Sequence, residues 1–201
     1  MKKQRAVFLD RDGVINRIVY HRELGIIDTP FTVGQFRLLP GVAQAIRKIN
    51  RLGLKAVVVS NQPGIAKRHF SHKTLVDMTK KMERAMKRGG AYLDAIYYCL
   101  HHPQAVNPAY KRRCPCRKPS PGLLKKGAEE LKIDLKSSFL VGDGIPDIQA
   151  GRRAGCRTIL IGNWKCDLCR LMEAKKLKPD YIASDILDAI GFIEKNLRIG
   201  S

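Results

Sequence analysis

The chain has 201 residues, of which 38 are lysine or arginine and 18 are aspartate or glutamate, giving a formal net charge of +20. Its length fits a single domain, expected to span residues 1–201, and no stretch approaches the roughly 18 apolar residues of a membrane-spanning helix. The N-terminal residues carry no signal-peptide pattern, so we expect a cytoplasmic monomer with no membrane partner.

Apolar segments alternate with amphipathic segments along the sequence. Short apolar runs predict buried strands at 6–9, 54–59, 95–98, 138–141, 158–161 and 181–183. Helical periodicity, with its start and stop signals, predicts helices at 41–52, at 72–88, from about 121, at 146–154 and at 185–197. A segment rich in proline and cysteine, 100–119, is expected to be an irregular loop. The alternation indicates an α/β fold with a doubly wound, mostly parallel sheet.

Polar residues follow several of the predicted strands directly. Asp10 and Asp12 follow the first strand, Ser60 follows the second and Asp143 follows the fourth. Ligands of open α/β sheets bind beyond the carboxyl ends of the strands, so these side chains are expected to line one crevice. Carboxylate oxygens suit Mg²⁺, which binds through one or two carboxylates together with phosphate. The three aspartates therefore predict a Mg²⁺ site.

The same residues suit phosphoryl transfer. Asp10 is positioned to attack phosphorus, and Asp12 to protonate the leaving group and then to activate water. Ser60 offers neutral donors, Lys118 a positive charge and Arg117 a two-pronged donor to phosphate. Two of these features have simpler explanations when taken alone. Asp10 and Asp12 could form an Asx turn after the strand, and Lys118 could be a solvated surface lysine. Their combination after successive strands favours a phosphatase that forms an aspartyl-phosphate.

The cysteine-rich loop suggests a second metal site. Cys99 and His101 form one pair, Cys114 and Cys116 form another, and twelve residues separate the pairs. Three thiolates and one imidazole make a closed tetrahedral set suited to structural Zn²⁺. The spacing leaves two alternatives open, which are buried thiols beside a surface histidine, and His102 as the ligand instead of His101. A bound Zn²⁺ would order the loop, about 99–118, and bring the residues after it to the crevice.

The positive charge favours an anionic partner, either a phosphorylated metabolite or a nucleic acid. Lysines and arginines occur in runs of at most three, without interleaved aromatic residues, so a small phosphorylated substrate is favoured and no nucleic acid is expected. A basic zinc-containing nucleic-acid-binding module is the remote alternative. Cys166 and Cys169 lack a further pair that would complete a metal site. The histidines expected at the surface without partners are His21, His69 and His72.

Residues 8–16, FLDRDGVIN, resemble the first motif of the haloacid dehalogenase superfamily of phosphatases. The other three motifs of the superfamily also have similar counterparts in this chain. Ser60 resembles the second motif, Lys118 the third, and Asp143 with Asp147 the fourth, and they occur in the same order. The resemblance spans about residues 5–165 and implies a Rossmann-like fold and a Mg²⁺-dependent phosphoric monoester hydrolase. It also implies that Asp12 offers the ion its backbone carbonyl.

Residues 97–103 and 114–122 resemble the zinc loop of the heptose-bisphosphate and histidinol-phosphate phosphatases. This resemblance implies that His101 is the zinc ligand and that no large cap domain is present. The long spacing between the ligand pairs is more similar to the heptose enzymes, which implies hydrolysis of the 7-phosphate of D-glycero-D-manno-heptose 1,7-bisphosphate. Histidinol phosphate or another small phosphate ester is the alternative. The residues expected to contact the substrate are Arg11, Asn61, Gln62 and Arg117.

Overall fold

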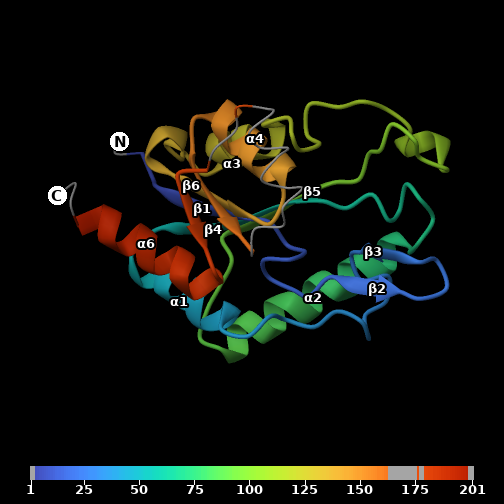
Figure 1. Cartoon of the computed structure of the whole chain (residues 1–201), viewed down its shortest axis with the longest axis horizontal. Helices are drawn as coiled ribbons and strands as arrows, with labels where there is room; N and C mark the ends of the chain where they lie inside the picture. The colour runs from blue at the N-terminus through green and yellow to red at the C-terminus, as the bar shows by residue number, and fades with distance from the viewer. Residues whose placement is uncertain (1–2, 163–175, 177–178, 199–201) are drawn as a thin grey trace.

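The computed structural model describes residues 3–162, 176 and 179–198, and its centre is a six-stranded sheet (Figure 1). Neighbouring strands are all parallel, in the order β5-β4-β1-β6-β7-β8. The strands are β1 (Ala6–Leu9), β4 (Lys55–Asn61), β5 (Ala95–Cys99), β6 (Phe139–Gly142), β7 (Arg157–Ile161) and β8 (Tyr181–Ala183). Each predicted strand is confirmed. β4 runs further than expected because Ser60 and Asn61 still pair with β5.

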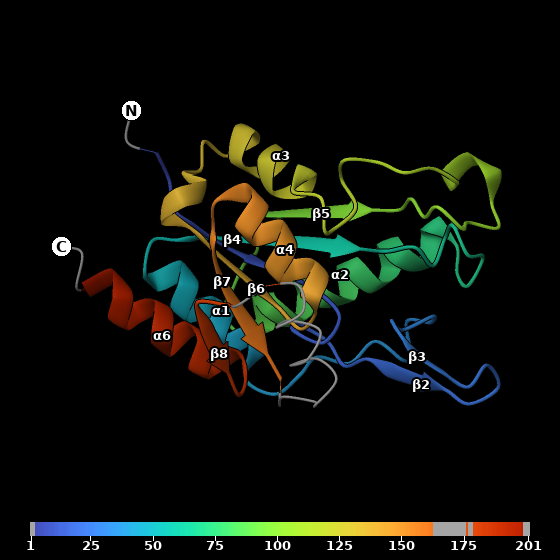
Figure 2. The ribbon, with the colours of Figure 1, turned by 45° about the horizontal axis from the view of Figure 1, so that its top comes forward.

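Helices cover both faces of this sheet (Figure 1 and Figure 2). One face carries α1 (Val42–Arg51), α2 (His72–Arg88) and α6 (Ile186–Arg198), and the other carries α3 (Gly122–Glu130) and α4 (Ile145–Ala154). The predicted helices are therefore confirmed, with small shifts at their ends. No helix among the described residues has the length and apolar character needed to cross a lipid bilayer.

Burial on both faces explains the unbroken apolar sequence of β1. Val7 and Leu9 pack in the cluster that contains residues of α1, α2 and α6, whereas Ala6 and Phe8 pack in the cluster beneath α3 and α4. Solvent reaches none of these four side chains. A strand that is covered on both sides has no polar face, so its sequence does not alternate.

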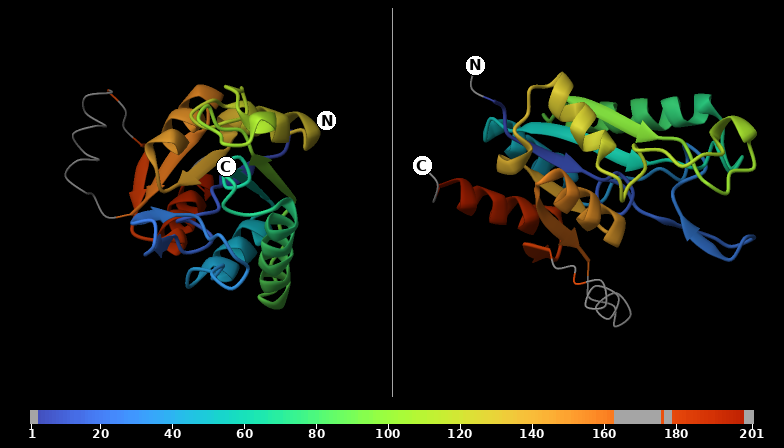
Figure 3. Two further views of the ribbon diagram at one scale, coloured as in Figure 1. Left: turned by 90° about the vertical axis from the view of Figure 1, so that its right-hand side faces the viewer. Right: turned by 90° about the horizontal axis from the view of Figure 1, so that it is seen from above.

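Two excursions lie beyond the carboxyl ends of the strands (Figure 3). The first is an antiparallel hairpin of β2 (Val19–His21) and β3 (Ile26–Asp28). The second is the loop after β5, which includes the 3-10 turn η1 (Pro108–Tyr110). A similar turn, η2 (Leu135–Ser137), precedes β6. The hairpin was not predicted, because its strands have three residues each and leave several apolar side chains exposed. Neither excursion forms a large cap domain in the described part of the chain. The family resemblance implied this arrangement, without a large cap.

The order of the strands reverses beside β1. From β1 the chain continues to β4 and β5 on one side, then returns to β6 on the other side and continues to β7 and β8. Leu9 pairs with Val58 of β4 and with Val141 of β6, so the segments that follow these strands emerge next to each other. Such a switch point is where doubly wound sheets bind their ligands.

Candidate active site

Three carboxylates meet at the switch point. Asp10 follows β1, Asp143 follows β6, and Asp147 lies in the first turn of α4. One ligand oxygen from each lies within 4.8 Å of the others. Oxygen donors at this spacing fit a divalent cation such as Mg²⁺. The expected approach of Asp10 to Asp143 is therefore present in the structure, and Asp147 joins them.

Gly13 makes this close approach of the carboxylates possible. Its φ is +80°, and a Cβ atom there would lie 2.0 Å from the Oδ2 atom of Asp143. A residue with a side chain would therefore be strained in its backbone and would push Asp143 away. The close approach is made to a carboxylate of the protein.

Lys118 is the positive charge of the cluster. Its side chain is buried, with its Nζ atom 3.0 Å from Oδ1 of Asp10 and 2.5 Å from Oδ1 of Asp147. Burial opposes the charge of Lys118, but Asp10 and Asp147 outweigh burial and raise its pKa. Lys118 is therefore a fixed cation next to the candidate nucleophile.

Burial, together with neighbouring negative charge, raises the pKa of two carboxyl groups. Burial, followed by repulsion from Asp10 and Asp147, raises the pKa of Asp143 to about 7. Burial likewise raises the pKa of Asp147 to about 6, although Lys118 acts in the opposite direction. Without a bound metal ion, Asp143 and Asp147 retain their protons at pH values well above the usual range for carboxyl groups. A divalent ion would have to displace them.

Asp12 lies beside this cluster and is held by four hydrogen bonds. Its Oδ1 atom accepts from Arg11 at 3.1 Å, from Asn16 at 2.8 Å and from the hydroxyl of Thr29 at 2.8 Å. Its Oδ2 atom accepts from Gln62 at 2.6 Å. Thr29 directly follows β3 and was not predicted, because no local pattern signals a contact across the hairpin. A carboxylate held at both oxygens is well positioned for proton transfer.

Three residues that were expected to contact the substrate support other residues of the site. Arg11 and Gln62 are both fully buried and direct their side chains at Asp12. The side chain of Asn61 exchanges two hydrogen bonds of 3.0 Å with the backbone of Lys118. Each of the three therefore has a partner within the protein, while Nε and Nη1 of Arg11 and Oε1 of Gln62 are buried without a hydrogen-bond partner among the described residues. Their predicted contact with the substrate stays a prediction.

Ser60 and Arg117 are the other residues that were predicted to contact phosphate. Ser60 is buried near the end of β4, where its Oγ atom accepts a hydrogen bond of 3.1 Å from Gln62. Arg117 is partly buried and donates from Nη1 to the carbonyl of His101 at 3.3 Å. Arg117 is thus attached to the loop that holds the cysteines.

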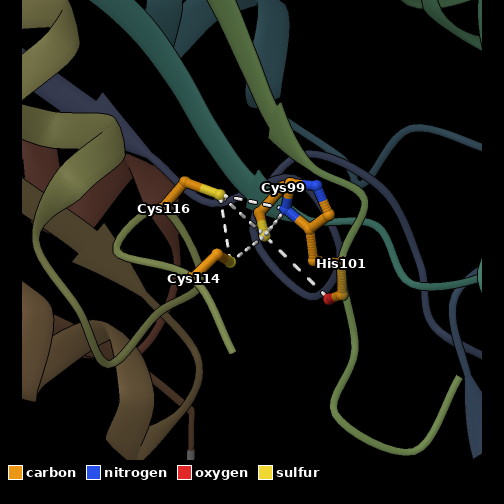
Figure 4. A group of neighbouring side chains, drawn as sticks. All are labelled: Cys99, His101, Cys114 and Cys116. Atoms are coloured by element: carbon orange, nitrogen blue, oxygen red, sulfur yellow. Dashed lines mark hydrogen bonds between the residues drawn. The ribbon is translucent and has the colours of Figure 1, made fainter. Parts of the chain in front are cut away.

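The predicted zinc ligands lie together (Figure 4). The Sγ atoms of Cys99, Cys114 and Cys116 are 3.2 to 3.5 Å apart, and Nδ1 of His101 is 3.5 Å from Cys116 and 3.9 Å from Cys99. Ligands at Zn–S distances of about 2.3 Å in a tetrahedron are separated by roughly 3.7 Å. The four residues therefore fit a Zn²⁺ ion. His102 lies outside the group, and its Nδ1 accepts from the backbone of Gln104.

The loop also contacts the rest of the crevice. The backbone N–H groups of Val106 and Asn107 both donate to the carbonyl of Ala66 at 3.0 Å. Through Asn61, β4 holds the backbone of Lys118. The end of the loop that carries the buried lysine is thereby fixed to the sheet.

Two histidines differ from the prediction that they lack partners. His21 is 9% exposed, and its ring stacks on Phe31 with 3.6 Å between centroids. His69 stacks on the other side of Phe31 at 4.3 Å. His72 is exposed, as predicted, but it has a partner, because its ring contacts the hydroxyl of Tyr110. Aromatic stacking between distant segments has no local sequence pattern. Cys166 and Cys169 lie outside the described residues.

Comparisons with known proteins agree with this fold. The HAD-hydrolase-like family model matches residues 115–189, a range that contains Lys118, Asp143 and Asp147. The D-glycero-beta-D-manno-heptose-1,7-bisphosphate 7-phosphatase of Photorhabdus laumondii is 41% identical over 191 residues, covering 94% of this chain and 97% of that protein. Its counterpart in Pasteurella multocida is 36% identical, covering 92% and 94%.

Solved structures give the same result. The D,D-heptose 1,7-bisphosphate phosphatase of B. bronchiseptica, complexed with magnesium and phosphate, is 30% identical with a TM-score of 0.78, covering 96% of this chain and 99% of that chain. The chain therefore belongs to the heptose-1,7-bisphosphate 7-phosphatase family within the haloacid dehalogenase-like phosphatases.

Proposed function

We propose that the chain hydrolyses the 7-phosphate of D-glycero-beta-D-manno-heptose 1,7-bisphosphate, the substrate that the curated relatives are named for. The observation that carries the proposal is the meeting of Asp10, Asp143 and Lys118 at the switch point of the sheet. Those groups supply a carboxylate nucleophile, metal ligands and a cation for phosphate in one crevice. Family membership favours the heptose over histidinol phosphate.

The chemistry requires two displacements at phosphorus. A carboxylate oxygen of Asp10 attacks the 7-phosphate, and the bond from phosphorus to the sugar oxygen breaks as Asp12 gives that oxygen a proton. Asp12, now a carboxylate, removes a proton from water. The resulting hydroxide attacks phosphorus and releases Asp10 and inorganic phosphate. Asp12 regains its proton in this second step, so the enzyme returns to its first state.

Fixed groups of the protein stabilise the charge on the transferred phosphoryl group. Lys118 contributes a buried positive charge, and Ser60 contributes a hydroxyl. The residues proposed to hold Mg²⁺ are Asp10 and Asp143, with the backbone carbonyl of Asp12. When bound, Mg²⁺ neutralises charge on the phosphoryl oxygens and orients them. Arg117 is the proposed contact to the sugar phosphate.

Asp10→Asn tests this mechanism, because it preserves shape and removes the nucleophilic charge. We expect turnover of the heptose bisphosphate to be abolished while circular dichroism and thermal melting remain those of a folded protein. Asp12→Asn is the companion variant, in which mass spectrometry is expected to detect a phosphate adduct on Asp10 after slow first-step chemistry. Near-normal turnover by Asp10→Asn would overturn the mechanism.

A substrate panel tests the specificity. Both anomers of the heptose bisphosphate and histidinol phosphate are assayed by phosphate release. We expect kcat/KM to be highest for the beta anomer. A clear preference for histidinol phosphate would reject the substrate assignment and leave the mechanism intact. Salt-sensitive DNA or RNA binding that persists in Asp10→Asn, without phosphatase activity in the wild type, would instead support the nucleic-acid alternative.

A further inference from the structure

A cavity of about 660 Å³ lies beside α2. It is formed where the segment between β3 and α1 runs beside α2 (Figure 1), and Lys81 of α2 donates a hydrogen bond of 2.7 Å to the carbonyl of Val33 there. We call it the basic pocket, because four cationic side chains line it: Arg17, Arg37, Lys81 and Arg88. The rest of its lining is apolar: Phe36, Leu38 and Ala85.

No acidic side chain lines the basic pocket. Within the described residues, none of its four cations takes part in an ion pair. The two acids of α2 are directed elsewhere, because Asp77 pairs with Lys73 and Glu83 lines two other cavities. The segment 29–41 contains no aspartate or glutamate. The positive charge of the pocket is therefore not neutralised by the protein around it.

Four like charges around one cavity repel each other, and a cavity lined by one sign of charge concentrates counter-ions. The volume falls within the roughly 300–1,000 Å³ typical of small-ligand sites. The residues proposed for catalysis do not line this pocket, so the crevice at the switch point does not account for it. We infer that the basic pocket is a second binding site, which takes a small anion with two or more phosphate groups.

The location of Arg88 provides a matched pair of variants. Arg88 is the last residue of α2, and Arg51 is the last residue of α1. Both are exposed and both complement the negative end of their helix dipole, so charge reversal costs the two helices similar stability. Arg88 lines the basic pocket and Arg51 does not. Arg51→Glu therefore controls for the change in net charge.

Isothermal titration calorimetry with inorganic tripolyphosphate tests the inference, at low salt and without added Mg²⁺. We expect the wild type to bind it, Arg88→Glu to bind about tenfold more weakly, and Arg51→Glu to stay within about twofold of the wild type. Arg37→Gln is the second pocket variant, for use if Arg88→Glu does not fold. Turnover is not measured, so this test is independent of the proposed activity.

Three results would overturn the inference. The first is no binding by the wild type. The second is equal weakening in Arg88→Glu and Arg51→Glu, which would indicate diffuse attraction to a chain of net charge +20. The third is unchanged binding in both pocket variants with loss of binding in Lys118→Met, which would place the anion in the crevice. An oligonucleotide that binds through Arg88 far more tightly than tripolyphosphate would replace the small anion by nucleic acid.

Discussion

Replacing Lys118 by methionine tests how the carboxylate cluster is held together. The side chain of Lys118 is 2% exposed and contacts Asp10 at 3.0 Å and Asp147 at 2.5 Å. Methionine is of similar length and fills the space without the charge. The variant leaves the carboxylates of Asp10, Asp143 and Asp147 close together with no buried cation between them.

The expected loss of stability follows from this burial. Removing one partner of a buried ion pair costs about 3–5 kcal/mol, because the remaining charge is left without compensation. The surface provides a matched comparison, since Lys55 contacts Asp94 at 2.8 Å but its side chain is 36% exposed. A fully exposed pair contributes less than about 1 kcal/mol. Because Lys55 stays in contact with water although the side chain of Asp94 is only 9% exposed, Lys55→Met should cost less than Lys118→Met. The two variants differ mainly in the burial of the lysine.

Urea denaturation at pH 8 measures both costs, with the free energy of unfolding obtained by linear extrapolation. The cost of Lys118→Met should shrink at pH 5, because the folded-state pKa values of Asp143 and Asp147 are about 7 and about 6, and both exceed the ordinary value of 3.8. Folded protein then binds more protons than unfolded protein, so stability from these groups falls as pH rises through this range. Added Mg²⁺ should restore part of the loss in Lys118→Met and none in Lys55→Met. Equal costs for the two variants would refute the reasoning.

Three further predictions concern the metal sites and Asp12. Mg²⁺ should bind more weakly at pH 5.5 than at pH 7.5, because burial and the neighbouring carboxylates raise the pKa of Asp143 to about 7; calorimetry that finds one affinity at both pH values would contradict this. Cys114→Ser should lose bound zinc and melt at a lower temperature, as measured by elemental analysis and calorimetry, whereas Cys156→Ser, a buried thiol outside the ligand group, should retain zinc. Thr29→Val should lower kcat about tenfold with little change in KM, because one hydrogen bond to the proton-transferring carboxylate is lost. Thr32→Val, in the same segment, should leave kcat unchanged, and equal kinetics of the two variants would exclude a role for the hairpin.

The sequence predicted the part of the site that depends on strand order. Asp10 and Asp143 each follow an apolar run, and parallel strands bring their carboxyl ends to one edge, so the approach of the two carboxylates could be inferred before the structure. The three cysteines of the candidate zinc site could be inferred from their spacing, whereas the choice of His101 over His102 came only from the family resemblance.

Contacts between distant segments could not be predicted in the same way. Thr29 reaches Asp12 from 17 residues away and Gln62 reaches it from 50 residues away, and neither contact leaves a periodic pattern. The burial of Arg11 also depends on tertiary packing, since its guanidinium lies 5.7 Å from the ring centroids of both Phe36 and Tyr98. A motif identifies the type of residue at a site, whereas packing decides whether its side chain faces solvent.

Each of the two excursions beyond the sheet contributes one residue to the candidate active site. The hairpin ends at Thr29, which touches Asp12, and the cysteine-rich loop ends at Lys118, which touches Asp10. Both contributions come from the base of the excursion, next to the sheet. The tips of the two excursions can therefore differ in length and composition without displacing Thr29 or Lys118, whereas a change at either base disturbs the contact with Asp12 or Asp10.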